Sequence, residues 1–122
     1  MTQNFGATDD IYMLDCTKKQ WKKLMVKLPY KASFHGTILL RNAIYVFGGK
    51  DQSENTLNYL YMLDSTNTWV KKANMNERRR GINNSSVEFN GEIWVMGGCT
   101  EAKVHSSVEK YNAISNTWTN VT

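Results

Sequence analysis

The stretch AIYVFGG at residues 43–49 decides the fold, and EIWVMGG at residues 92–98 repeats it 49 residues later. Each run is apolar at consecutive positions and ends in a glycine pair. A strand that is apolar on both sides has to be covered on both sides. A recurrence with a period near 50 residues is typical of a repeat architecture. The sequence therefore predicts layers of β-sheet, each built from one repeat.

Length and composition favour one modest folded domain. The chain has 122 residues, of which 41% are hydrophobic and 21% charged, so a disordered chain is not expected. No apolar run approaches the ~20 residues that span a membrane. The first six residues lack the basic and apolar regions of a secretory signal. We therefore expect a cytoplasmic protein without membrane contact, in which Cys16 and Cys99 are free thiols.

The net charge of +4 is mild, and the basic residues are spread along the chain. Nucleic-acid binding usually needs a basic patch on one element, so no nucleic-acid partner is predicted. Acidic protein partners remain compatible with this charge. Without a secretory signal, no glycosylation is expected at the sequons of Asn83, Asn84 and Asn120, and we also place Asn83 and Asn84 in an inner strand, where a glycan would not fit.

Short apolar runs between polar turns predict an all-β chain without helix. Two-residue turns are expected at Arg41-Asn42 and Asn90-Gly91, the second being a strong hairpin signal. Each repeat thus contains four strands, a to d, joined as a meander. The expected strands are 10–15, 21–24, 34–40, 43–47, 57–64, 69–73, 82–89, 93–96, 106–111 and 118–121.

Polarity changes systematically along each unit. Strand b is almost wholly apolar, whereas strand d is a tryptophan followed by polar residues. Inner strands covered by neighbouring layers and an outer strand that meets water are what a propeller blade requires.

These features together resemble the kelch repeat. The resemblance rests on the glycine-pair strands 44–49 and 93–98, and on a tryptophan 20 residues after each pair, at Trp69 and Trp118. Trp94 stands where tyrosine is usual, and Asn112 where aspartate is usual. The structural motif then comprises Gly48, Gly49, Gly97, Gly98, Tyr45, Trp94, Trp21, Trp69 and Trp118.

The resemblance implies a partial kelch β-propeller with two four-stranded antiparallel blades and the outer half of a preceding blade. We expect a partial repeat at 1–33 (strands c and d) and repeats at 34–80 and 81–122. Kelch propellers usually close with five to seven blades, so the chain is expected to be a fragment. A blade buries its faces only against neighbours. The open faces therefore predict self-association or marginal stability.

The alternative chemical interpretations are weaker. The glycine pairs do not have the spacing of a phosphate-binding loop, so a backbone role is favoured. The tryptophans could stack on bases or sugars, but one per unit indicates packing between blades. His35 and His105 lack a cluster of metal ligands or acid–base partners. We therefore expect no cofactor, no metal and no catalysis, although a copper radical oxidase on a kelch propeller exists as an analogy.

Candidate partner-binding residues lie in loops. Glu77-Arg78-Arg79-Arg80 occupies the connector between two repeats, and by the resemblance this connector shares a face with the loops 50–56 and 99–105. Arginines there could bind a carboxylate-rich peptide. The alternative is that one arginine pairs with a neighbouring blade while the others are solvated. The full candidate set is Arg78, Arg79, Arg80, Tyr30, Lys31 and Lys50.

The resemblance implies a non-catalytic protein-interaction module, similar to the substrate-recognition domain of cullin-type ubiquitin ligase adaptors. That role elsewhere in the family involves a separate BTB domain. Two alternatives stay open: an actin- or cytoskeleton-binding kelch protein, and a truncated non-functional remnant.

Overall fold

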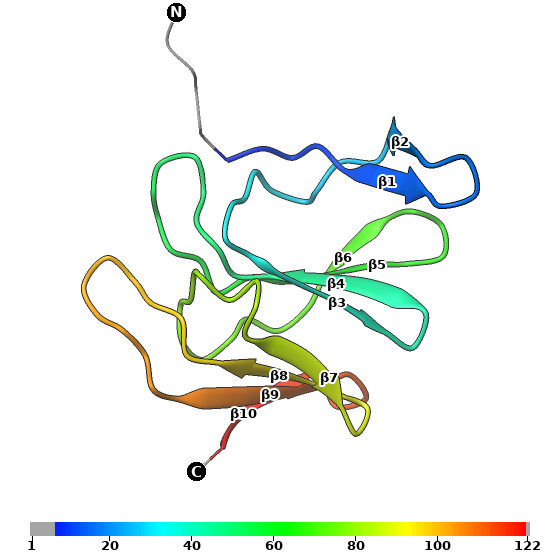
Figure 1. The fold of residues 1–122 in the computed structure, drawn as a ribbon. Helices are drawn as coiled ribbons and strands as arrows, with labels where there is room; N and C mark the ends of the chain where they lie inside the picture. The colour runs from blue at the N-terminus through cyan, green and yellow to red at the C-terminus, as the bar shows by residue number, and fades with distance from the viewer. Residues whose placement is uncertain (1–6, 122) are drawn as a thin grey trace, which may run out of the picture.

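The computed structural model describes residues 7–121, which form three antiparallel sheets stacked as layers (Figure 1). In this part of the chain there are ten strands and no helix, so no helix there could cross a membrane. The first layer is the hairpin β1–β2, the second has the order β3-β4-β5-β6, and the third has the order β7-β8-β9-β10. The bounds are β1 Tyr12–Asp15, β2 Gln20–Lys23, β3 Gly36–Leu40, β4 Ala43–Phe47, β5 Leu60–Leu63, β6 Trp69–Lys71, β7 Ser86–Phe89, β8 Glu92–Met96, β9 Val108–Asn112 and β10 Thr117–Val121.

The predicted all-β meander is confirmed, and the glycine-pair strands lie where they were expected, at β4 and β8. Two predicted strands are only half as long as expected, and four others are shorter by one or two residues. The run 57–64 forms a strand only over β5, and the run 82–89 only over β7. Ile82 is fully buried, yet its carbonyl accepts a hydrogen bond from the Ser85 backbone amide in a turn. Because Ile82 is apolar and buried although it lies in a turn, the sequence pattern made the strand seem to begin there.

The placement of Asn83 and Asn84 in an inner strand was wrong. Both residues are exposed in the turn that precedes β7. The argument that a glycan would not fit there therefore falls away.

The two predicted hairpin turns adopt the same backbone conformation. Arg41 and Asn42 have φ angles of 51° and 62°, and Asn90 and Gly91 have φ angles of 58° and 77°. Positive φ at both central residues is the hairpin turn whose twist matches that of the flanking strands. The turns consequently fix the pairing of β3 with β4 and of β7 with β8.

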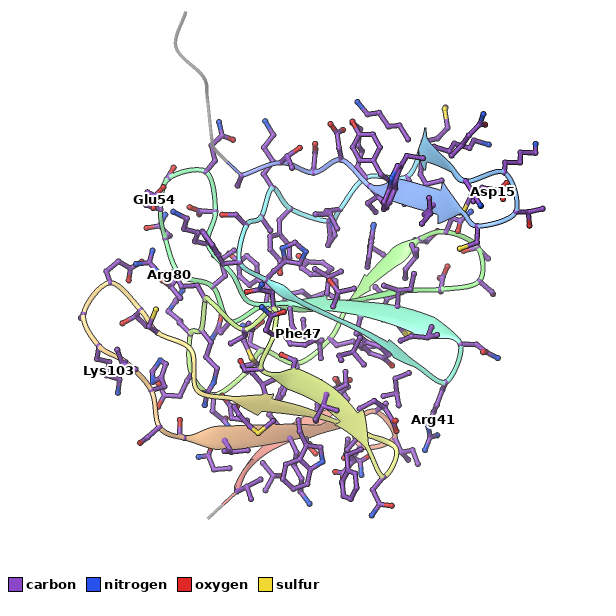
Figure 2. All side chains as sticks on the ribbon, in the orientation of Figure 1. Asp15, Arg41, Phe47, Glu54, Arg80 and Lys103 are labelled. Carbon is purple, nitrogen blue, oxygen red and sulfur yellow. The ribbon has the colours of Figure 1, made fainter. Side chains whose placement is uncertain are left out.

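The core lies between the two four-stranded sheets, where Phe47 sits in Figure 2. The Trp118 ring contacts Phe47 across this interface with ring centroids 6.4 Å apart, and it contacts Tyr111 at 5.2 Å. Burial raises the pKa of Tyr111 to about 12, while its hydroxyl donates to Asn116 Oδ1 at 2.7 Å. Aromatic packing of this kind supplies a large part of the burial that holds two layers together.

The strand-d tryptophans also latch one layer to the previous one. The Trp118 indole N–H donates to the Ala73 carbonyl at 2.9 Å, and the Trp69 indole N–H donates to the Lys27 carbonyl at 2.6 Å. Each acceptor belongs to the connector that leaves the preceding strand d. In the first layer the corresponding Trp21 is 69% exposed. Packing between layers is therefore the role of Trp69 and Trp118.

The glycine pairs allow the connector to approach the end of strand b. A Cβ added to Gly48 would lie 2.7 Å from the Arg79 carbonyl oxygen, and one added to Gly49 would lie 2.6 Å from the Ser33 carbonyl oxygen. Both glycines also have positive φ, at 62° and 88°. A backbone role thus explains the pair without any phosphate-binding function.

The turns between strands c and d share one hydrogen-bonding device. Oδ1 of Asp15, Asp64 and Asn112 accepts bonds from backbone amides two and three or four residues later. A side-chain oxygen that accepts such bonds mimics a backbone turn. Asn112, which departs from the usual kelch aspartate, therefore preserves the turn.

Candidate functional site

One end of the layers gathers the loops, and we call it the loop edge. It consists of the connectors 24–35 and 72–85 and the b–c loops 48–59 and 97–107. Figure 2 shows Glu54, Arg80 and Lys103 at this end, whereas Arg41 and Asp15 lie at the opposite end. The expectation that connectors and b–c loops share a face is confirmed, because Arg80 and Cys99 exchange two backbone hydrogen bonds of 3.0 Å.

Arg79 is the anchor of the loop edge. Its side chain has no exposed surface, and its Nε lies 3.1 Å from Glu109 Oε2. One terminal nitrogen donates to the carbonyls of Gly97 and Ser107 at 2.6 and 3.0 Å, and the other donates to Ser107 Oγ at 2.8 Å. A buried guanidinium is tolerated when its donors are met in this way.

Glu109 completes the anchor from strand β9. It is fully buried, and its two carboxylate oxygens accept the backbone amides of Asn76 and Glu77 at 2.7 and 3.1 Å. The connector therefore reaches into the next layer through Arg79, while that layer reaches back through Glu109. This reciprocal exchange fixes the connector between β6 and β7.

The preceding interface uses the same geometry with different chemistry. The Tyr30 hydroxyl donates to the Gly48 carbonyl at 2.9 Å, as Arg79 does to the Gly97 carbonyl. The Tyr30 ring packs on Tyr59 and Tyr61, with centroids 5.4 and 5.7 Å away. Tyr59 pairs with Gly48 as Ser107 pairs with Gly97, since each carbonyl accepts the glycine amide. An aromatic cluster thus replaces the polar Arg79 cluster one layer earlier.

These contacts change the set of candidate partner-binding residues. Arg79 has no surface to offer a partner, so it is withdrawn from that set. Tyr30 is half-buried and occupied by its own interface, and burial raises the pKa of its hydroxyl. The alternative interpretation, that one arginine pairs with a neighbouring blade, describes Arg79. Its partner Glu109 was not singled out from the sequence. Acidic residues are rarely buried unless they are paired, so a glutamate in a strand with neighbours on both sides was a usable signal.

The remaining cations lie at the surface of the loop edge. Lys31 and Arg78 are exposed, and Arg80 is half-buried. Arg78 donates to the Thr56 carbonyl at 3.2 Å, which leaves most of its fork free. Glu54 meets Lys50 at 2.5 Å and Arg80 at 3.9 Å. The structure therefore brings Lys50 and Arg80 together around one carboxylate.

Arg78 lines a polar cleft of about 530 Å³ together with Asp51, the loop 53–57, Tyr59 and Glu101. Glu101 Oε1 accepts the hydroxyl and the backbone amide of Thr56 at 2.7 and 3.0 Å. The Thr56 hydroxyl in particular lowers the pKa of Glu101. This contact joins the two b–c loops across the cleft.

The two histidines lie in different surroundings. His105 Nε2 lies 2.9 Å from the Arg78 carbonyl, and His35 is partly buried with no hydrogen-bond partner for Nδ1. Burial lowers the pKa of His35. Across the described chain, no three His, Cys, Asp or Glu side chains gather to hold a metal. Cys16 and Cys99 are both free.

An apolar hollow of about 330 Å³ lies between the β1–β2 layer and the second sheet. Its walls include Leu24, Leu28, Ile44, Val46 and His35. Its lining residues belong to both layers and to the connector 24–35, so we treat it as a loosely filled part of the interface between the layers.

Comparison with known proteins agrees with this geometry. Residues 1–122 match the family model described as the KLHDC2/KLHL20/DRC7 Kelch-repeats domain. Kelch-like protein 36 of Rattus norvegicus is 35% identical over 119 residues, which cover 93% of this chain and 19% of that protein. Spermatocyte protein spe-26 of Caenorhabditis elegans is 32% identical over 119 residues, covering 93% and 21% of the two chains.

Kelch-like protein 35 of Mus musculus is 34% identical over 101 residues, covering 82% of this chain and 17% of that protein. The chain thus spans about a fifth of the length of these relatives. The matched region includes both glycine-pair strands and the loop edge. The chain belongs to the Kelch-repeat family, and its two four-stranded sheets are blades of a partial kelch propeller.

Proposed function

We propose that this chain is a non-catalytic protein-interaction segment whose loop edge binds an acidic segment of a partner protein. The observation that carries the proposal is the difference in burial among three consecutive arginines. Arg79 is buried and clamps the connector, while Arg78 and Arg80 on either side of it stay at the surface. A clamped backbone lets flanking side chains present charge at a low entropic cost.

The charge at this edge fits a carboxylate-bearing partner. Lys31, Lys50, Arg78, Arg80 and Lys103 belong to the loop edge. Three of these, Lys50, Arg78 and Arg80, are held against loop backbone or Glu54. Arginine binds carboxylates through two parallel hydrogen bonds, which adds geometric specificity to the attraction.

The wider cellular role is proposed from the family. From the resemblance to kelch proteins of the adaptor type, we propose a cytoplasmic module that recruits a substrate to a cullin-type ubiquitin ligase, with the ligase contact made by another part of a longer protein. This step rests on analogy between folds, which by itself does not determine function. The test is whether a cullin co-purifies with the whole protein from cells. If none does, the adaptor role is wrong, while the interaction role is unaffected.

An experiment can separate the exposed arginines from their surroundings. Proteins captured from source cells by the wild-type chain are compared with those captured by the variant Arg78→Gln/Arg80→Gln. The control variant Lys22→Gln/Lys23→Gln removes two exposed charges from β2, away from the loop edge. The proposal expects a partner retained by wild type and control but lost from the arginine variant. Retention of the same proteins by all three chains would contradict it.

Self-association is a separate proposal, and the outer face of the third layer supports it. Phe89 and Met96 are 61% and 40% exposed, whereas the residues at the same positions of the previous repeat, Leu40 and Phe47, are 4% and 0% exposed. On strand β8, which also carries Met96, the indole N–H of Trp94 is buried without a hydrogen-bond partner. An apolar face of this kind favours association with another sheet.

A further inference from the structure

Phe34 has a backbone conformation that aromatic residues rarely adopt. Its φ angle is 57°, and 56% of its surface is exposed. Positive φ in a bulky residue is a strained state that other parts of the structure must maintain. Among the described non-glycine residues with positive φ, Phe34 is the one aromatic, and the others are Lys19, Arg41, Asn42, Glu54, Asn67, Asn90 and Asn116.

The next repeat has glycine at the matching position. The backbone of Ser33 pairs with that of Lys50, just as Arg80 pairs with Cys99. Lys50 and Cys99 each come directly after a glycine pair, so Ser33 and Arg80 occupy matching positions in the two repeats. The residues after Ser33 and Arg80 are Phe34 and Gly81, and Gly81 also has positive φ, at 72°. The fold therefore requires a left-handed residue here, and glycine meets that requirement without strain. Packing does not explain the phenylalanine, because most of its surface is open.

Phe34 borders a hollow of about 390 Å³ on the loop edge, together with Lys50, Glu54, Arg80, Gly81 and Cys99. The Lys50 ammonium lies 5.4 Å from the centre of the Phe34 ring. Gly81 adds no side chain, and a Cβ built on it would meet nothing within 4 Å. The hollow is thus lined by one aromatic ring, Cys99 and the side-chain-free Gly81, together with the charged residues Lys50, Arg80 and Glu54.

The Glu54 carboxylate already lies between the two cations of this hollow, which shows that they can bind a carboxylate. This residue is itself in the left-handed region, with φ at 70°, and its carboxylate lies 2.5 Å from Lys50 and 3.9 Å from Arg80. Its side chain is 67% exposed, so it is easily displaced. Arg80 also lies close enough to Glu101 that, after the Thr56 hydrogen bonds, its charge helps to lower the pKa of that carboxylate. A partner carboxylate can therefore pair with Lys50 and Arg80 by displacing the exposed Glu54.

We propose that Phe34 is the apolar anchor of the loop edge, and that its hollow receives an aliphatic side chain flanked by carboxylates on a partner peptide. This inference rests on the proposed function and deepens it by naming the anchor and the peptide chemistry. The aliphatic side chain packs on the Phe34 ring over Gly81. The flanking carboxylates pair with Lys50 and Arg80. Side chains that fill a desolvated pocket, with surrounding contacts that exclude water, supply much of the binding energy at interfaces.

The test uses the whole chain, labelled with ¹⁵N, and a heptapeptide of sequence Gly-Ser-Glu-Leu-Glu-Gly-Ser. Binding is followed by amide chemical shifts in wild type and in Phe34→Gly, with thermal unfolding measured on the same samples. The control Ile114→Gly removes an exposed aliphatic side chain from the opposite end, where φ is not positive. Control peptides replace both Glu by Gln, or Leu by Ser.

The expected result is binding to wild type with shifts at Gly81 and Cys99, weakened at least fivefold in Phe34→Gly and unchanged in Ile114→Gly. Phe34→Gly should melt at or above the wild-type temperature, because glycine relieves the strain. Each control peptide should bind at least fivefold more weakly than the Glu-Leu-Glu peptide.

Two results would overturn the inference. If Phe34→Gly binds like wild type while Arg78→Gln/Arg80→Gln binds more weakly, the anchor is wrong and the proposed function stands. If the wild-type chain does not bind the Glu-Leu-Glu peptide, or binds the Leu-to-Ser control equally well, the proposed peptide chemistry is wrong.

Discussion

The Arg79 guanidinium and the Glu109 carboxylate meet at 3.1 Å across the interface between the two blades, and neither side chain is exposed to solvent. Arg79 belongs to the connector and Glu109 to strand β9. Around this pair, five further polar groups are satisfied by direct hydrogen bonds. Two carbonyls and the Ser107 hydroxyl accept from Arg79, and the amides of Asn76 and Glu77 donate to Glu109. The pair therefore determines the path of the loops that carry the candidate binding residues.

Removing one member of this pair should be costly. Glu109→Ala leaves the Arg79 charge buried and two backbone amides without acceptors. We expect the free energy of unfolding to fall by about 3–5 kcal/mol, as measured by urea denaturation. The double variant Arg79→Met/Glu109→Leu removes both charges and should be more stable than Glu109→Ala. A loss below about 1 kcal/mol in Glu109→Ala would contradict the anchor role.

Two glycines with positive φ should respond differently to alanine. Gly81→Ala adds a Cβ that meets nothing within 4 Å, so only the backbone strain of about 1–2 kcal/mol is expected. Gly48→Ala also places its Cβ 2.7 Å from the Arg79 carbonyl oxygen, so the loss should reach about 2–5 kcal/mol. Thermal and urea unfolding of both variants measures the difference. Equal losses would show that the close approach of the connector is not what Gly48 permits.

Stability should decline in mild acid partly through His35. Burial lowers the pKa of this imidazole below its ordinary value of 6.5, so the unfolded chain binds the proton first as the pH falls. The contribution of His35 is constant above pH 6.5, and destabilisation begins below it. Urea unfolding of wild type and His35→Leu should give a constant difference between pH 7 and 8 and a growing advantage for the leucine variant toward pH 5.5. Parallel curves over this range would contradict the burial of a neutral His35.

The exposed face of the third layer should make the chain associate. Phe89→Lys/Met96→Lys places charge where the matching residues of the previous blade are covered by a neighbour. In sedimentation velocity, we expect wild type to show a concentration-dependent increase in sedimentation coefficient that this variant loses. The control Gln20→Lys/Gln52→Lys adds the same charge at exposed polar positions and should behave like wild type. A sharp monomer boundary for wild type at all concentrations, with a cooperative melt, would refute self-association.

The parts of the fold that depend on local chemistry could be predicted from the sequence. Asn90-Gly91 specifies its own turn, and the strand Ala43–Phe47 is marked by its apolar run and glycine pair. The start of β7 could not be predicted, because Ile82 is buried by a contact distant in sequence and reads as part of a strand. Tertiary contacts override the local pattern there.

The binding site was only partly predictable for a similar reason. Three adjacent arginines look alike in sequence, and Glu109, which buries one of them, lies 30 residues away. Phe34 was hidden because two extra residues separate Gly81 from its strand, so the offset of 49 residues does not align the two positions. Only the backbone pairing of Ser33 with Lys50 and of Arg80 with Cys99 shows that they correspond.

We propose that the loop edge, held by Arg79 and Glu109, is the surface that binds an acidic partner segment. The most direct measurement maps the amide shifts of the ¹⁵N-labelled chain during titration with the Glu-Leu-Glu heptapeptide. We expect shifts confined to residues 31–35, 50–57, 78–82 and 99–105, and their loss in Arg78→Gln/Arg80→Gln. Shifts centred on the opposite turns at 41–42, 65–68 and 113–116, or unchanged binding by the arginine variant, would contradict it.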